Sequence, residues 1–210
     1  MKYCFFLAAL AIIPAWGQSR PDLGGVWLPN HVGSVGPSET LPFLPSAKAK
    51  FQQNSGQQSE TDRRCLPPGV PRIMFQSRPF EIVQDQERVL FLYEGGGHVW
   101  RQVWMDGRAH PPDPNPDWLG HSIGHWEGET LVVDSVGFND RTWLDDAGHP
   151  HTEQLHVIEK FTRMNAAKMK YEVTIDDPGA YSQPWSASSS LNFRPDDKIE
   201  EDICLDKASK

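Results

Sequence analysis

The chain has 210 residues, of which 20 are lysine or arginine and 28 are aspartate or glutamate, so its formal net charge is −8. Nucleic acids and anionic membranes bind basic surfaces, and this acidic balance argues against both as partners. A chain of this length normally forms one domain with a substantial core.

The first 17 residues are typical of a signal peptide. Lys2 precedes an apolar run from Tyr3 to Ala15, and small residues at Ala15 and Gly17 predict cleavage before Gln18. The run is too short to anchor the chain in a bilayer, and no later stretch approaches the roughly 18 apolar residues that an anchor needs. We therefore expect an exported protein, periplasmic or extracellular, with no membrane anchor in the mature chain.

Two cysteines remain after this cleavage, Cys65 and Cys204. An even number of cysteines in an exported protein indicates a disulfide. The bond would close a long loop, which the chain-entropy model values at about 4–5 kcal/mol. Two separate buried thiols are the alternative.

Residues 18–78 are predicted to be an N-terminal extension that packs on a domain formed by residues 79–210. The extension contains a first strand in "GGVWLP" and a short helix in "PSAKAKFQQ". The rest of it is polar and rich in proline, which indicates loops.

Short apolar runs rich in Val, Ile, Phe, Tyr and Trp follow from Phe80, and they favour strands. "FEIV" and "RVLFLYE" flank the polar "QDQE" as a hairpin. After "GGG" comes "HVWRQVWM", where Arg101 shares one face with two valines, while Trp100 and Trp104 share the other. The prolines of "AHPPDPNPD" exclude a central strand there.

"LHVIEKF" and "KMKYEVTID" form another predicted hairpin, in which His156 lies opposite Asp176. Its alternating pattern indicates one buried and one solvated face. "SASSSLNF" and "EEDICLD" are weaker last strands. About eight to ten sequential strands predict an all-β fold, an antiparallel meander barrel of the lipocalin-like kind, with a two-sheet β-sandwich as the alternative.

The stretch "HSIGHWEGETLVVD" contains a tight-turn pair at Glu127-Gly128. If these two residues are the whole loop, His121 lies opposite Asp134; a loop one residue longer places it opposite Ser135. An aspartate beside a histidine orients the ring and raises its pKa, as a general base or metal ligand requires. Alternatively, the pair only satisfies two polar groups at the barrel mouth.

The segment "GHPHTEQLH" contains His149, His151 and His156. Histidines two residues apart on an extended segment can chelate zinc or copper, but this spacing fits no established zinc motif. No cofactor is therefore predicted, and these histidines are weak metal candidates. Seven tryptophans of the mature chain either pack the core or line part of a cavity.

The block "LGHSIGHWEGETLVVDSVGFNDRTWLDDAGHPHTEQLHVIEKF", together with "RCLPPGVPR", resembles a family of exported bacterial proteins of unknown function. The similarity covers roughly residues 65 to 185. It implies a site near His121 and the loop from Phe138 to Glu153. His125 stands where the family has a basic residue such as arginine. The recurrent family motif matches His121, Asp134, Asn139, Asp140, Trp143, Asp145, His151 and Glu159.

Three functions remain open. The first is an exported barrel that binds a small organic molecule at its mouth, with ligand-binding candidates Trp143, Asn139, Arg101, Trp104 and Glu159. The second is a general acid–base enzyme of the lyase, hydratase or isomerase type. Its catalytic candidates are His121 or His151 as base and Asp134 or Asp145 as the orienting carboxylate. The third, weaker reading is a metal-dependent hydrolase built on the three histidines above.

Overall fold

A computed structural model describes residues 20–30, 34–36 and 38–203. The predicted signal peptide and Cys204 lie outside these residues. None of the helices in the described part of the chain is both long and apolar enough to cross a bilayer.

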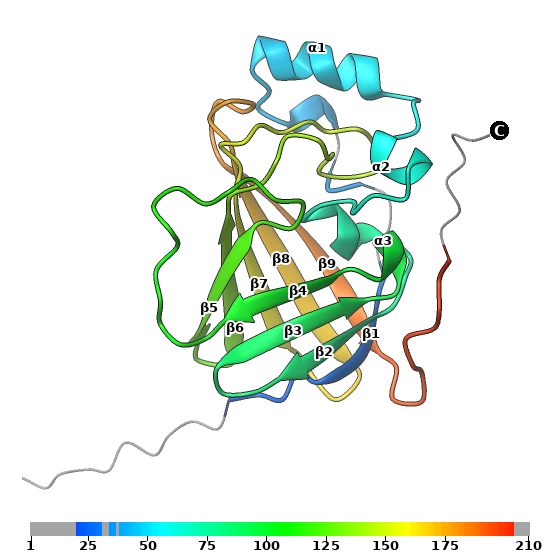
Figure 1. Cartoon of the computed structure of the whole chain (residues 1–210), viewed down its shortest axis with the longest axis vertical. Helices are drawn as coiled ribbons and strands as arrows, with labels where there is room; N and C mark the ends of the chain where they lie inside the picture. The colour runs from blue at the N-terminus through cyan, green and yellow to red at the C-terminus, as the bar shows by residue number, and fades with distance from the viewer. Residues whose placement is uncertain (1–19, 31–33, 37, 204–210) are drawn as a thin grey trace, which may run out of the picture.

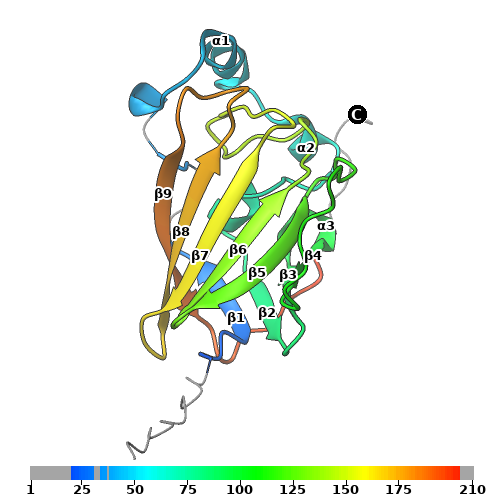
Figure 2. The ribbon, with the colours of Figure 1, turned by 90° about the vertical axis from the view of Figure 1, so that its left-hand side faces the viewer.

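Nine strands close into a barrel in chain order (Figures 1 and 2). This confirms the predicted all-β barrel. Neighbouring strands are antiparallel, and β1 closes the barrel against β9, but β4 and β5 run parallel. The strands are β1 (Gly25–Pro29), β2 (Phe80–Gln84), β3 (Arg88–Tyr93), β4 (Trp100–Trp104), β5 (His121–Glu127), β6 (Thr130–Val136), β7 (His156–Arg163), β8 (Lys168–Asp176) and β9 (Trp185–Phe193).

The parallel pair departs from the predicted antiparallel meander. A hairpin cannot join parallel strands, and here the proline-rich loop 105–120 makes the longer crossover. The two strands pair only through Val103 with Ser122 and Trp104 with Ile123. Beyond these residues β4 and β5 diverge, so the seam between them is the weakest part of the wall (Figure 1).

The predicted hairpins can be compared with the observed registers. In the β7–β8 pair, His156 lies opposite Asp176, as predicted. In the β5–β6 pair the predicted register is wrong, because the turn is Gly128-Glu129 and His121 pairs with Val136. The shift is two residues, so His121 and Asp134 keep the same face of the sheet but are diagonal neighbours.

Phenylalanine and tyrosine side chains fill the barrel interior. The ring centroid of Phe161 lies 5.2 Å from that of Phe91 and 5.1 Å from that of Tyr171. Trp27 is fully buried, whereas Trp100 is 59% exposed. Trp185 also belongs to the core, so the tryptophans divide between the interior and the surface.

Short helices cover one end of the barrel, together with the loops 137–155 and 177–184 (Figures 1 and 2). The predicted helix in the extension is confirmed as α1 (Pro45–Asn54). The 3₁₀ turn η2 (Arg72–Phe75) closes this end with buried apolar side chains. Glu200 to Ile203, at the start of the predicted last strand, is not a strand. The remaining helices are η1 (Ser38–Thr40), α2 (Glu60–Arg63) and α3 (Gly95–His98).

Candidate functional site

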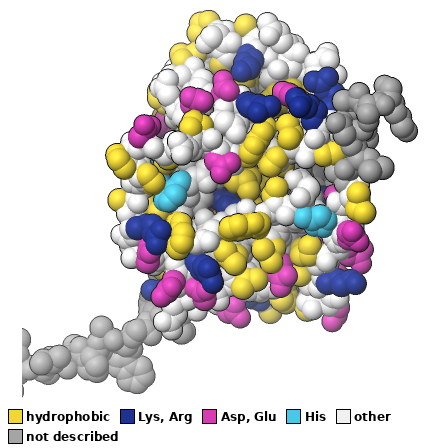
Figure 3. Space-filling model, in the orientation of Figure 1, with side chains coloured by type: hydrophobic (Ala, Val, Ile, Leu, Met, Phe, Trp, Pro, Cys, Tyr) yellow, Lys and Arg dark blue, Asp and Glu magenta, His cyan; other side chains and the backbone are white. Residues whose placement is uncertain are grey.

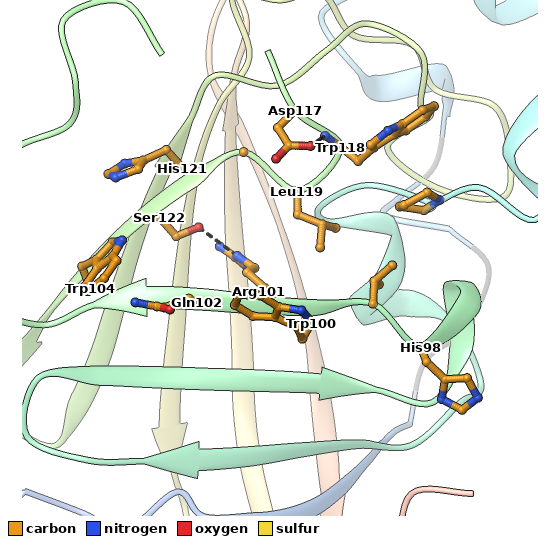
Figure 4. Close-up of a pocket in the computed structure, with 13 residues that line it drawn as sticks. His98, Trp100, Arg101, Gln102, Trp104, Asp117, Trp118, Leu119, His121 and Ser122 are labelled. Carbon is orange, nitrogen blue, oxygen red and sulfur yellow. Dashed lines mark hydrogen bonds between the residues drawn. The ribbon is translucent and has the colours of Figure 1, made fainter. Parts of the chain in front are cut away.

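A cavity of about 510 Å³ lies beside the β4–β5 seam (Figure 4). It exists because the two strands diverge and the end of the loop 105–120 borders the gap. Figure 3 shows a hollow on this face of the molecule, with a basic side chain at its floor. The cavity is lined by Pro67, His98, Val99, Trp100, Arg101, Gln102, Trp104, Asp117, Trp118, Leu119, Gly120, His121 and Ser122.

Three indoles line this cavity: Trp100, Trp104 and Trp118. Two of them are covered by guanidinium groups, with Arg108 lying 3.6 Å from the ring centroid of Trp104 and Arg141 lying 4.8 Å from that of Trp118. Such cation–π contacts hold the indole planes in place. The walls therefore offer flat apolar surfaces that are already oriented.

Arg101 forms the floor of the cavity and is 2% exposed. Its Nε donates to Ser122 Oγ at 2.9 Å, and its Nη2 donates to Ser135 Oγ at 2.7 Å and to Glu159 Oε2 at 2.5 Å. Its Nη1 and the Nε2 of Gln102 are buried, and neither has a hydrogen-bond partner among the described residues. A buried donor without an acceptor costs about 1–3 kcal/mol, so these two atoms require an explanation.

Glu159 balances the charge of Arg101. Burial acts to lower the pKa of Arg101, but the adjacent Glu159 carboxylate outweighs it and raises that pKa. Tyr171 donates its hydroxyl to Glu159 at 2.9 Å, and burial raises the pKa of Tyr171. The floor therefore consists of an ion pair in which the Nη1 amino group of Arg101, with its two N–H bonds, is unused by the described residues.

A chain of imidazoles runs from the outer face of the sheet to the cavity. His121 Nδ1 lies 2.8 Å from His110 Nδ1, and His110 Nε2 lies 3.1 Å from Asp134 Oδ1. His156 Nε2 approaches the same Asp134 oxygen at 2.7 Å. Burial, with the nearby His110 and Arg108, lowers the pKa of His121. At neutral pH His121 is therefore an uncharged imidazole at the cavity edge, with one N–H and one lone pair.

These contacts revise the predicted pair. His121 and Asp134 are connected through His110 and do not pair directly. Sequence reasoning missed His110 because it lies in "AHPPDPNPD", where no periodicity shows which way a side chain points. Arg101, Trp104 and His121 are brought together at the cavity, with Glu159 directly behind Arg101.

The remaining predicted residues lie elsewhere. Asp145 does not orient His151, because its Oδ2 lies 2.6 Å from His149 Nδ1. His151 Nε2 instead lies 2.6 Å from Thr142 Oγ1, and burial lowers the pKa of His151. Of the pairings that the sequence left open, a His151 base oriented by Asp145 is therefore not formed in the structure.

Besides Glu159, two more predicted ligand-binding residues do not line the cavity. Cζ of Arg72 lies 5.7 Å from the ring centroid of Trp143. Trp143 borders a different surface depression. Asn139 accepts a hydrogen bond from the backbone N–H of Arg141 at 3.1 Å. The loop from Phe138 to Glu153 thus has contacts of its own, away from the seam.

The weak metal candidates are held in separate networks. His149 bonds to Asp145, His151 to Thr142 and His156 to Asp134. Within the described residues, no group of three or more His, Cys, Asp or Glu side chains is arranged to hold a metal ion. The metal-dependent hydrolase reading has no site there.

Comparison with models of protein families, with curated proteins and with solved structures finds no match to this chain. The functional argument therefore depends on the geometry above.

Proposed function

We propose that this protein binds a small, partly apolar molecule in the cavity beside the β4–β5 seam. The observation that carries the proposal is a cavity lined by three indoles together with Arg101 and Gln102, whose buried Nη1 and Nε2 have no acceptor among the described residues. Aromatic walls with a few convergent polar groups are the usual chemistry of a ligand pocket. On this proposal the ligand enters through the barrel wall and not at the mouth.

The chemistry of the lining restricts the ligand. Indole faces favour a planar ring, because aromatic pairs gain about 0.5–1.5 kcal/mol beyond the burial of their area. The two free donors favour an oxygen acceptor, either a carbonyl or a carboxylate. Glu159 already compensates the charge of Arg101, so a full negative charge is not required. We infer a planar unsaturated compound that bears a carbonyl or carboxylate oxygen.

The predicted signal peptide supports a role for this binding outside the cytoplasm, in the periplasm or the medium. We also propose that the chain belongs to the family of exported bacterial proteins that it resembles over residues 65 to 185. The long middle block supports that membership.

The test is a calorimetric titration with 2-naphthoate, and with naphthalene as the matched probe that lacks an acceptor. We expect 2-naphthoate to bind and naphthalene to bind at least about tenfold more weakly, since a hydrogen bond to a charged donor contributes roughly 1.5–3 kcal/mol. Gln102→Leu and Trp104→Ala should each weaken 2-naphthoate binding.

Trp143→Ala is the control, because Trp143 does not line this cavity. It removes the same kind of side chain from another surface. Equal binding of both probes, or an equal loss in the control and in Trp104→Ala, would refute the proposal.

The imidazole chain favours a second candidate function, general acid–base catalysis on the bound molecule. Asp134 holds His110, and His110 holds His121, which leaves the other ring nitrogen of His121 to exchange a proton with a ligand. The expected reaction is removal of a proton next to the ligand carbonyl.

This second candidate is tested by proton magnetic resonance in D₂O with 2-naphthylacetone. Wild-type protein should accelerate deuterium exchange beside the carbonyl, and His121→Gln should remove about 10²-fold or more of the acceleration. His110→Gln should reduce it less. Exchange at the rate of the protein-free control would leave the binding function alone.

A further inference from the structure

A second group of chemically reactive side chains lies at the covered end of the barrel, separate from the seam cavity. His149 Nδ1 lies 2.6 Å from Asp145 Oδ2, and His149 Nε2 lies 2.9 Å from Ser38 Oγ. A hydroxyl, an imidazole and a carboxylate are thus joined in sequence by hydrogen bonds. Those are the order and spacing that an activated serine nucleophile requires.

The surroundings of Asp145 determine which nitrogen of the His149 imidazole carries the proton. Asp145 also accepts a hydrogen bond from the backbone N–H of Val35 at 2.9 Å. Burial acts to raise the pKa of Asp145, but the bonds from His149 and Val35 outweigh it and lower that pKa. The ionised carboxylate therefore holds the proton of His149 on Nδ1. This leaves the Nε2 lone pair facing the hydroxyl of Ser38.

Two phenyl rings hold the imidazole in place. The ring centroid of His149 lies 4.7 Å from that of Phe51 at an interplanar angle of 7°, and 5.8 Å from that of Phe43 at 28°. His149 itself is fully buried. The ring is therefore shielded from water, and its Nε2 contacts the hydroxyl of Ser38.

Ser38 is partly exposed and lines a cavity of about 450 Å³ with Phe43, Phe51 and Lys48. A small ester could thus reach Oγ while its apolar acyl chain contacts the two phenyl rings. The cavity places the nucleophile where a substrate can meet it.

We propose that Ser38, His149 and Asp145 form a serine nucleophile site that hydrolyses esters of short apolar acids. Ser38 Oγ forms a bond to the carbonyl carbon as its proton passes to His149 Nε2. The ester C–O bond then breaks, and the departing alcohol takes that proton. Water, activated in the same way, cleaves the acyl–Ser38 bond, releases the acid and restores the hydroxyl.

The test uses a fluorophosphonate probe and p-nitrophenyl butyrate with the full chain. We expect the probe to label Ser38, as located by peptide mass spectrometry, and the ester to be hydrolysed. Ser38→Ala should abolish both. Asp145→Asn should slow both by about 10³–10⁴-fold, since loss of the orienting carboxylate leaves the wrong tautomer.

Ser182→Ala is the matched control, because Ser182 borders the same cavity but donates its hydroxyl to the carbonyl of Pro42. It should keep labelling and hydrolysis. Labelling of wild-type protein no faster than of urea-unfolded protein, or labelling elsewhere than Ser38, would overturn the proposal.

A further variant keeps the proposal testable if Asp145→Asn does not fold. In Ser38→Cys the thiol meets the same imidazole, so iodoacetamide should alkylate it faster than it alkylates the unfolded variant. Alkylation no faster than in the unfolded chain would show that His149 does not activate position 38, and would overturn the proposal.

Discussion

Arg101 and Glu159 form an ion pair inside the barrel, with Nη2 and Oε2 2.5 Å apart and both side chains almost inaccessible to solvent. The pair links β4 to β7 across the interior, and Ser122, Ser135 and Tyr171 add further hydrogen bonds to it. Because it forms the floor of the proposed ligand cavity, its integrity decides both stability and binding.

Removing one charge of this pair should be strongly destabilising. Glu159→Gln leaves the Arg101 charge buried without its counter-ion, and breaking a buried pair in this way costs roughly 3–5 kcal/mol. Urea unfolding followed by circular dichroism measures the loss. Arg101→Met combined with Glu159→Met should recover part of it, since no charge remains buried. A double variant less stable than Glu159→Gln would contradict this account.

Stability should fall on mild acidification because of His151. Burial lowers the pKa of His151 below its ordinary value of 6.5, so below about pH 6.5 the unfolded chain binds more protons than the folded chain. The folded state therefore loses stability as the pH falls from 6.5 toward the lowered pKa, by at most about 1.4 kcal/mol per pH unit.

The measurement is urea unfolding of wild type and His151→Gln between about pH 7.5 and pH 5. The variant keeps an amide near Thr142 but does not titrate, so its stability should change less with pH. Parallel curves for the two proteins would show that His151 does not carry this dependence. The comparison also cancels the contributions of the other histidines.

Gly69→Ala should disrupt the contact between the N-terminal extension and the loop that follows β6. Gly69 has φ 84°, and a Cβ there would lie 2.5 Å from Thr142 Oγ1. The backbone strain and the clash together cost roughly 2–4 kcal/mol. Since Thr142 also bonds to His151, the amide exchange of residues 142 to 151 should accelerate. Unchanged amide exchange of residues 142 to 151, with an unchanged free energy of unfolding, would contradict the close contact between Gly69 and Thr142.

The predicted disulfide between Cys65 and Cys204 is testable in the mature protein. Cys204 lies outside the described residues, but Asp202 borders the same depression as Cys65, so the preceding segment runs past this cysteine. We expect no reaction with Ellman's reagent in the unfolded, unreduced protein. Reduction should then cost about 4–5 kcal/mol of stability. Two free thiols in the unreduced protein would exclude the bond.

Local pattern was sufficient for much of the barrel. The hairpin of β7 and β8 alternates between apolar and polar residues over its whole length, which determines the face that buries Phe161 and Tyr171, and the observed register is the predicted one. The β5–β6 register was not. Its turn residues allow more than one two-residue loop, and a slip by two leaves the same side chains facing inward.

The residues of the site also divide into those that the local pattern predicted and those that only the tertiary structure placed. Alternation along β4 separated Arg101 from the tryptophans, because strand geometry turns neighbouring side chains to opposite faces. The chain alone thus determined an acidic all-β protein and several of its pocket residues. Only the tertiary structure decided the rest: where β4 and β5 part, that His110 comes between His121 and Asp134, and that Ser38 meets His149 from a position 111 residues away. Such contacts form between irregular segments, whose direction is set by packing against the barrel and not by any local periodicity.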